Sequence, residues 1–157
     1  MATNKTTRTV RRKEGAIARV LLGDGFGSAL AVVLAEPSVA IFDDRGHEGD
    51  DLAWLRNEEP MFIVSVSNYA ITRGRWPIVD RGPMDTSRFP ILPKFVQDRS
   101  WPDDIQIYEK GCFRRATRAE AQGLERLAVW DPEHVEDRVR DAYAGRENKW
   151  VLSMKLL

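Results

Sequence analysis

The first third of the chain alternates apolar stretches with short glycine-bearing breaks. Residues 16–22 and 28–34 are apolar runs of strand length, and Gly23-Asp24-Gly25 stands between them. An Asp-Gly pair between two apolar runs is typical of a β-hairpin, because glycine adopts positive φ without steric cost. A third apolar run covers residues 39–42. The pattern therefore predicts an antiparallel meander of three short strands, which begins a small sheet or barrel.

The strongest apolar strand of the sequence lies in residues 61–66, and a second short strand follows at residues 78–79. Between them, Gly74 is expected to take a backbone shape that other residues resist. Trp76 is expected to pack a large apolar area against the sheet. This stretch, from Pro60 to Asp80, is interpreted as the structural centre of the fold.

Prolines at positions 83, 90, 93 and 102 exclude a long helix from residues 81–104 and disfavour central strands. We expect an irregular segment whose apolar side chains pack on the core. These side chains are Phe89, Ile91, Leu92, Phe95, Val96 and Trp101. A hairpin follows, with a strand at residues 105–108 and its partner at residues 112–116.

Helical signals appear late in the chain. Thr117 and Glu120 form a capping box, and the helix is predicted to continue to about residue 128. Asp131 and Pro132 start a second helix, which Gly145 closes. Residues 149–157 are expected to form a final strand. The predicted fold class is α+β: a twisted, mostly antiparallel sheet or partly curled small barrel, with two helices near the C-terminus.

Length and composition favour one domain over residues 14–157, preceded by a mobile basic arm at residues 1–13. The net charge of zero argues against a general nucleic-acid binder. A single cysteine and two histidines argue against a disulfide and a metal site. No apolar run is long enough for a membrane span, and no secretory signal is visible. We expect a cytoplasmic protein that has no cofactor, no metal ion and no catalytic residues.

The stretch at residues 43–59 is rich in carboxylates, which are Asp43, Asp44, Glu48, Asp50, Asp51, Glu58 and Glu59. Its spacing does not match an EF-hand calcium loop. Two interpretations remain: a solvated acidic loop, or a loop that presents charge to a basic partner and speeds association. Arg73 and Arg75 also allow two interpretations, as contacts for a partner or as cations paired with local acids and aromatic rings.

Several strings in the sequence resemble the bacterial immunity protein 26 family. They include Val39-Ala40-Ile41-Phe42-Asp43, Gly74-Arg75-Trp76-Pro77, and Val129-Trp130-Asp131-Pro132-Glu133, and the likeness spans about residues 15–140. The chain departs from the family pattern at Ala16 and Asp80, both near turns. In this resemblance Gly74, Trp76, Trp130 and Asp131 are structural. The resemblance implies a non-catalytic protein that binds and neutralises a cognate toxin domain.

Two other functions compete with this interpretation. A small β-barrel module would use the basic arm to bind nucleic acid, or would bind another protein. A small hydrolase would need His47 or His134 to approach Cys112 or a carboxylate in space. A lone cysteine is more often a buried apolar residue than a nucleophile, and Cys112 is expected to be buried.

Overall fold

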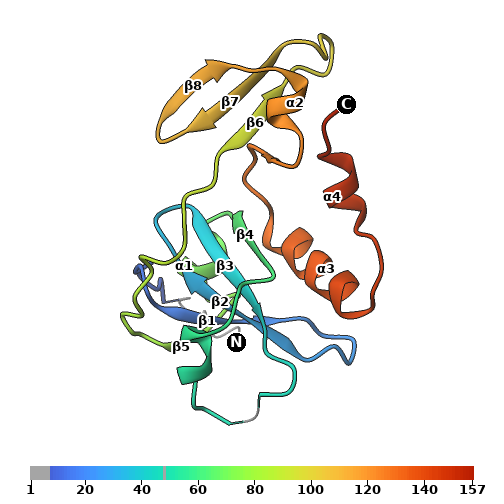
Figure 1. Cartoon of the computed structure of the whole chain (residues 1–157). Coiled ribbons are helices and arrows are strands. Elements are labelled where there is room, and N and C mark those ends of the chain that lie inside the picture. Colours follow the sequence, from blue (N-terminus) through green and yellow to red (C-terminus); the bar gives the residue numbers. More distant parts are fainter. Residues whose placement is uncertain (1–7, 48) are drawn as a thin grey trace, which may run out of the picture.

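The computed structural model describes residues 8–47 and 49–157, so Glu48 and the first seven residues of the predicted arm lie outside the described residues. The structure contains two sheets, which lie one above the other in the view of Figure 1, with helices beside them. The α+β class is therefore confirmed, and neither sheet closes into a barrel.

The larger sheet contains the predicted meander at its centre. Its strand order is β4-β3-β2-β1-β5, and every pairing is antiparallel. The strands are β1 (Ile17–Leu21), β2 (Ser28–Val33), β3 (Ser38–Asp43), β4 (Phe62–Ser65) and β5 (Ile78–Asp80). Gly23 and Gly25 both have positive φ in the β1–β2 turn, as the Asp-Gly signal predicts.

The smaller sheet has the order β8-β7-β6-β9. Its strands are β6 (Lys94–Gln97), β7 (Ile105–Glu109), β8 (Cys112–Arg115) and β9 (Glu125–Arg126). The predicted hairpin is confirmed as β7 and β8, which pair antiparallel. The short β9 runs parallel to β6, and Trp130 then pairs with Val66 beyond the end of β4. The segment from β9 to Trp130 therefore connects the edges of the two sheets.

Five short or medium helices complete the part of the fold that the structure describes. They are η1 (Ala53–Arg56, a 3-10 helix), α1 (Tyr69–Thr72), α2 (Arg118–Ala121), α3 (Pro132–Tyr143) and α4 (Lys149–Ser153). None of the helices in residues 8–47 and 49–157 combines the length and apolar character that a membrane crossing needs. Pro132 occupies the first turn of α3, and Gly145 follows its C-cap with positive φ, as predicted.

The larger sheet is buried on both faces. On one face, Ala31, Val33 and Ile41 pack with Val135 and Val139 of α3 and with the fully buried Trp76. On the other face, a second cluster contains alternate residues of the same strands, together with residues from η1 and from the connection between β5 and β6. Its members include Ile17, Leu30, Val32, Phe42, Leu55 and Phe89. Alternation of side chains along a strand explains how one meander supplies both clusters.

The predicted final strand is wrong, because residues 149–153 form α4. Asn148 supplies the N-cap, and its side-chain oxygen accepts hydrogen bonds from the backbone N–H groups of Trp150 and Val151. The helix predicted to continue to about residue 128 is also too long. The capping box of Thr117 and Glu120 is present, but α2 ends at Ala121, and Gly123 has positive φ.

Part of the predicted core is exposed. Phe89 and Phe95 are buried as expected, whereas Ile91, Leu92 and Trp101 are exposed, and so is Cys112 on β8. All four residues of β8 are exposed, so neither face of this edge strand is covered and Cys112 stays outside the core.

The part of the predicted mobile arm that the structure describes lies against the domain. The backbone N–H of Val10 donates to the carbonyl of Thr72 at 2.9 Å. The Arg12 guanidinium donates to the carbonyls of Leu34 and Ser38 at 2.7 and 2.8 Å. Residues 8–13 thus differ from the expectation of an unattached segment.

Candidate functional site

The acidic stretch begins with two carboxylates that are engaged within the protein. Asp43 forms a close ion pair with Arg45, with 2.8 Å between Oδ2 and Nη2, and the Arg45 side chain lies 4.0 Å from the centre of the Tyr143 ring. The hydrogen bonds from Arg45 lower the pKa of the Asp43 carboxyl. Asp44 accepts from the Ser28 hydroxyl at 2.6 Å and pairs with Arg19 at 3.3 Å. These two carboxylates connect the loop to β1, β2 and α3.

Asp50 and Asp51 lie in a separate hollow of about 640 Å³, which Asp80 and Asp85 also line. Arg56 and Arg88 line the same hollow. Asp51 accepts a hydrogen bond from the backbone N–H of Ala53 at 3.0 Å and so stabilises the start of η1. Within the described part of the chain, no three histidine, cysteine, aspartate or glutamate side chains are grouped to hold a metal ion. Asp50 and Asp51 are exposed, as are Glu58 and Glu59 at the end of the same stretch, and these acids remain available to a partner.

Arg75 and Trp76 both contact Glu136, a carboxylate on α3 whose role the sequence did not reveal. Arg75 donates from Nε and Nη2 at 2.8 and 2.9 Å, and the Trp76 indole N–H donates at 2.9 Å. Glu136 is only 5% exposed. The hydrogen bonds that Arg75 donates to the Glu136 carboxylate raise the pKa of Arg75. Arg75 is therefore an internal ion-pair partner, and Arg73 lies over the Tyr69 ring at 5.9 Å.

Two of the strings that resemble the immunity protein 26 family meet at this point, because Arg75 pairs with Glu133 at 3.4 Å. Arg75 and Trp76 come from the turn before β5, and Glu136 lies in α3, five residues after Asp131. Trp130 donates its backbone N–H to Ser65 at 2.8 Å and accepts from Ser67 at 3.0 Å. Asp131 precedes α3 without a side-chain capping bond. The strings that carry the family resemblance thus join α3 to the edge of the larger sheet.

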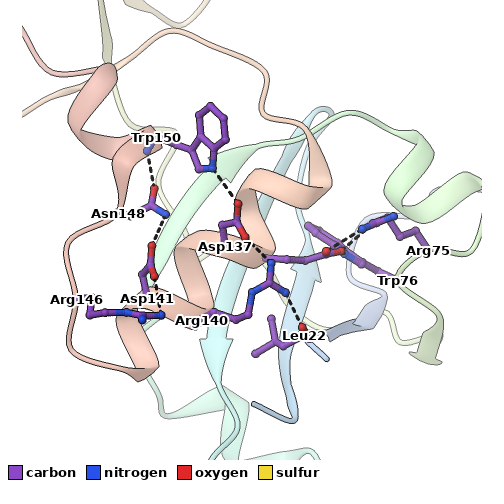
Figure 2. A network of polar contacts seen from close by, with 10 residues as sticks. Leu22, Arg75, Trp76, Asp137, Arg140, Asp141, Arg146, Asn148 and Trp150 are labelled. Carbon is purple, nitrogen blue, oxygen red and sulfur yellow. Dashed lines mark hydrogen bonds and ion pairs between the residues drawn. The ribbon is translucent and has the colours of Figure 1, made fainter. Parts of the chain in front are cut away.

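A wider polar network extends from the same helix (Figure 2). Arg140 donates to the Leu22 carbonyl at 2.5 Å and contacts Asp137. Asp137 accepts from the Trp150 indole N–H at 3.0 Å, and Asp141 accepts from the Asn148 amide at 2.9 Å. These bonds attach α4 to α3, and α3 to the larger sheet. The network is structural.

The histidines and the cysteine lie in different parts of the fold. His47 stacks on Trp54 and His134 stacks on Trp150, each with 3.6 Å between ring centres. Cys112 lies on β8, at the opposite end of the molecule from α3 (Figure 1). The structure does not bring His47 or His134 together with Cys112, which is the arrangement that a cysteine hydrolase would need.

A wide open hollow, with a volume of about 890 Å³, lies between the two sheets. Its apolar lining includes Leu34, Ile63, Phe89, Ile91, Leu92 and Val129. We call this hollow the inter-sheet groove. Three of its side chains are strongly exposed: Ile91 by 70%, Val129 by 59% and Leu92 by 49%. The sequence analysis missed the groove, because it assigned Ile91 and Leu92 to the core.

Charged side chains stand on both walls of the inter-sheet groove. Lys94 and Lys110 belong to the wall formed by the smaller sheet, and Glu14 and Glu36 belong to the opposite wall. Burial lowers the pKa of Lys94, although Glu125 at 3.9 Å opposes this effect. The Lys94 ammonium group is therefore largely buried and only weakly paired, and a carboxylate of a bound partner would stabilise its charge.

Comparisons with known proteins add no relative to this description: no family model, curated protein or solved structure matches the chain. Membership of the immunity protein 26 family therefore stays a prediction from the sequence. The arrangement of the inter-sheet groove is the main structural guide to function.

Proposed function

We propose that this chain is a non-catalytic binding protein that neutralises a bacterial toxin domain, and that the inter-sheet groove receives a segment of that toxin. The proposal combines two independent supports. The family resemblance points to an immunity protein, and the groove provides a concave apolar surface of the kind that protein partners bind.

The single observation that carries the proposal is the exposure of apolar side chains in the groove. Ile91, Leu92 and Val129 are large apolar residues that water contacts in the free protein. Contiguous exposed apolar surface within a hollow marks an interaction site more often than scattered surface residues do. Burial of such side chains against a partner contributes about 25 cal/mol per Å² of apolar area.

The charges on the groove walls define the chemistry of the toxin segment. Lys94 and Lys110 favour an acidic side chain on the segment, near the smaller sheet. Glu14 and Glu36 favour a basic side chain on the opposite side. We therefore propose an apolar segment with one acidic and one basic flank. Asp50 and Asp51 are placed to attract a basic toxin surface and to increase the association rate.

Co-expression with a toxin domain encoded beside this gene tests the proposal. The native chain should restore growth and form a stable complex. Ile91→Asp and Val129→Asp place a carboxylate in the apolar groove, and they should abolish rescue while leaving the fold intact. Trp101→Asp is the matched control, because Trp101 is 72% exposed and does not line the groove.

The same complex tests the acidic loop. Reversal of Asp50 and Asp51 to lysine should slow association at low ionic strength and have little effect at high ionic strength, because salt screens exposed charges.

Retained rescue by the groove variants would remove the groove from the proposal. Failure of the native chain to protect against any neighbouring toxin would overturn the function itself.

A further inference from the structure

The smaller sheet ends in an uncovered edge at β8. The strand order β8-β7-β6-β9 places β8 at the end of the sheet, next to β7, and it forms the outer side of the sheet in Figure 1. Proline and bulges are two means by which edge strands avoid pairing with other chains. The four described residues of β8 include no proline, and their register with β7 shows no bulge. This edge can therefore accept a further strand.

The other end strands of the two sheets are shorter or already engaged. β5 and β9 contain three and two residues. Val66, directly after β4, pairs with Trp130. Among the strands that the structure describes, β8 is thus the end strand best suited to pairing.

Backbone groups of two residues point outward from this edge. In an antiparallel pair, successive residues direct their backbone N–H and C=O groups alternately to the partner strand and away from it. The N–H of Ala116, directly after β8, donates to the carbonyl of Ile105 at 3.0 Å, so the even-numbered residues of the strand face β7. The N–H and C=O groups of Phe113 and Arg115 therefore face the free edge. They have the arrangement that main-chain pairing with an added strand requires.

The side chains of these two residues place an aromatic ring and a cation on the same face of the sheet. Phe113 is opposite Tyr108 in the register, with 4.9 Å between the ring centres, and it is 56% exposed. Arg115 forms no salt bridge within the described part of the chain. Arg114 lies on the other face, because side chains alternate along a strand, and it pairs there with Glu120 of α2 at 2.9 Å.

The charge of this edge defines the partner that it fits. Residues 109–115 carry Lys110, Arg114 and Arg115 but a single acid, Glu109. Opposite charges on neighbouring strands stabilise pairing, and like charges destabilise it. A second copy of the chain would bring two sets of these cations together, so the cations oppose self-pairing. An acidic strand would instead supply the carboxylate that Arg115 lacks.

We infer that β8 accepts an acidic, extended segment of a protein partner, which pairs antiparallel with the free edge. The segment places a carboxylate opposite Arg115 and, two residues later, an apolar side chain opposite Phe113. Its main chain bonds to the outward backbone groups of the same two residues and provides affinity, while the two side chains provide specificity. Residues 112–115 do not line the inter-sheet groove, so this inference is independent of the groove and of the proposed toxin.

Titration of the full chain with the synthetic peptide acetyl-Thr-Glu-Thr-Val-Thr-amide tests the inference, with amide hydrogen exchange measured by NMR as the readout. In the free chain, the amides of Phe113 and Arg115 should exchange faster than those of Cys112 and Arg114, which face β7. Peptide at about ten times its Kd should slow exchange at Phe113 and Arg115 about tenfold, because only the unbound fraction of the chain exchanges.

N-methylated peptides separate main-chain pairing from contact with the side chains. A methyl group on the valine nitrogen removes the N–H that donates to the Phe113 carbonyl, and it should weaken binding at least about tenfold. The same group on the central threonine lies on the far side of the added strand and should leave the Kd within about twofold. Equal binding of the two methylated peptides would overturn the inference.

Variants of the chain test the charge. Arg115→Gln should weaken peptide binding about two- to fivefold, the range of an exposed ion pair, whereas Arg56→Gln in η1 should leave it unchanged. Protection that rises with chain concentration in the absence of peptide would assign the edge to a second copy. Displacement of the peptide by a uridylate octamer, with shifts at Tyr108 and Phe113, would assign this face to single-stranded RNA. Either result, or a peptide that protects neither outward amide, would overturn the inference.

Discussion

The carboxylate of Glu136 is predicted to be the most sensitive polar group of the fold. It is 5% exposed and accepts three hydrogen bonds, two from Arg75 and one from Trp76. Glu136→Ala would leave the Trp76 indole N–H buried without an acceptor, since Trp76 is 0% exposed. An orphaned buried donor costs about 1–3 kcal/mol. It would also remove the largely buried carboxylate that pairs with the Arg75 guanidinium.

The expected total follows from the exposure of the two partners. Loss of one member of a fully buried ion pair costs about 3–5 kcal/mol. The Arg75 side chain is 38% exposed, and water screens it once Glu136 is gone. We therefore expect Glu136→Ala to lower the free energy of unfolding by about 3 kcal/mol, at the low end of that range. Glu136→Gln keeps an acceptor for the indole and should cost about half as much.

Urea unfolding followed by far-UV circular dichroism measures this difference. In a domain of this size, about 3 kcal/mol corresponds to a melting temperature lower by roughly 6–12 °C. Glu133→Ala is the control, because Glu133 lies on the same helix and contacts the same guanidinium at 3.4 Å, but its side chain is 52% exposed. That change should cost less than about 1 kcal/mol.

Equal losses for Glu136→Ala and Glu133→Ala would refute the reasoning, because burial would then have no influence on the ion pair. A double-mutant cycle with Arg75→Ala and Trp76→Phe adds a sharper check. If the geometry is correct, the coupling energy of Glu136 should be divided between these two partners. No coupling with either residue would show that the hydrogen bonds do not stabilise the fold.

Two further predictions concern backbone packing and pH. Gly15 has a φ of +87°, and a Cβ there would lie 2.7 Å from the Met84 carbonyl oxygen, whereas a Cβ at Gly25 would meet nothing within 4 Å. Both positions have positive φ, so the backbone strain of an alanine is similar at the two sites and the overlap with Met84 is the difference between them. Gly15→Ala should therefore lower the free energy of unfolding more than Gly25→Ala, by at least about 1 kcal/mol, in the same urea assay. Equal effects would contradict the predicted overlap. Burial alone would raise the pKa of Asp137, but hydrogen bonds from Trp150 and Arg140 lower it overall. Its stabilising effect is therefore present above the unfolded pKa of about 3.9 and is lost as the pH falls through the lower folded value. Asp137→Asn should flatten the loss of stability measured between neutral and acidic pH, and an unchanged slope would exclude this contribution.

Local signals predicted much of the secondary structure. The Asp-Gly turn and the alternating strands around it are confirmed as the β1–β2 hairpin and the meander. The capping box at Thr117 and the Asp-Pro start of α3 are also confirmed. Each of these signals depends on residues only a few positions apart, so it can be recognised without knowledge of the fold.

The two errors in secondary structure have different causes: distant segments pair with part of one predicted helix, and a local helix cap was overlooked in the predicted final strand. Residues 125–130 extend a helical pattern in the sequence, but they pair instead with β6 and with the end of β4. Residues 149–153 are apolar enough for a strand, yet the side chain of Asn148 caps a helix there. A short apolar run fits either structure, and only its neighbours decide between them.

The candidate sites depend still more on tertiary structure. Glu136 lies 60 residues from Trp76, and no spacing rule connects the two positions. Ile91 and Leu92 are apolar in sequence, and only the placement of the two sheets leaves them exposed in a groove. Acidic composition suggested a partner-binding loop, but the structure uses Asp43 and Asp44 for internal pairs.

The sequence by itself determined the class of the fold, the central meander and the turns at its ends, because these depend on alternation, glycine and capping over short distances. The tertiary structure alone decided which side chains meet across the chain. It paired the Arg75–Trp76 turn with Glu136 and opened a groove between the sheets. Burial and charge pairing are properties of distant residues brought together, and a linear pattern does not contain them.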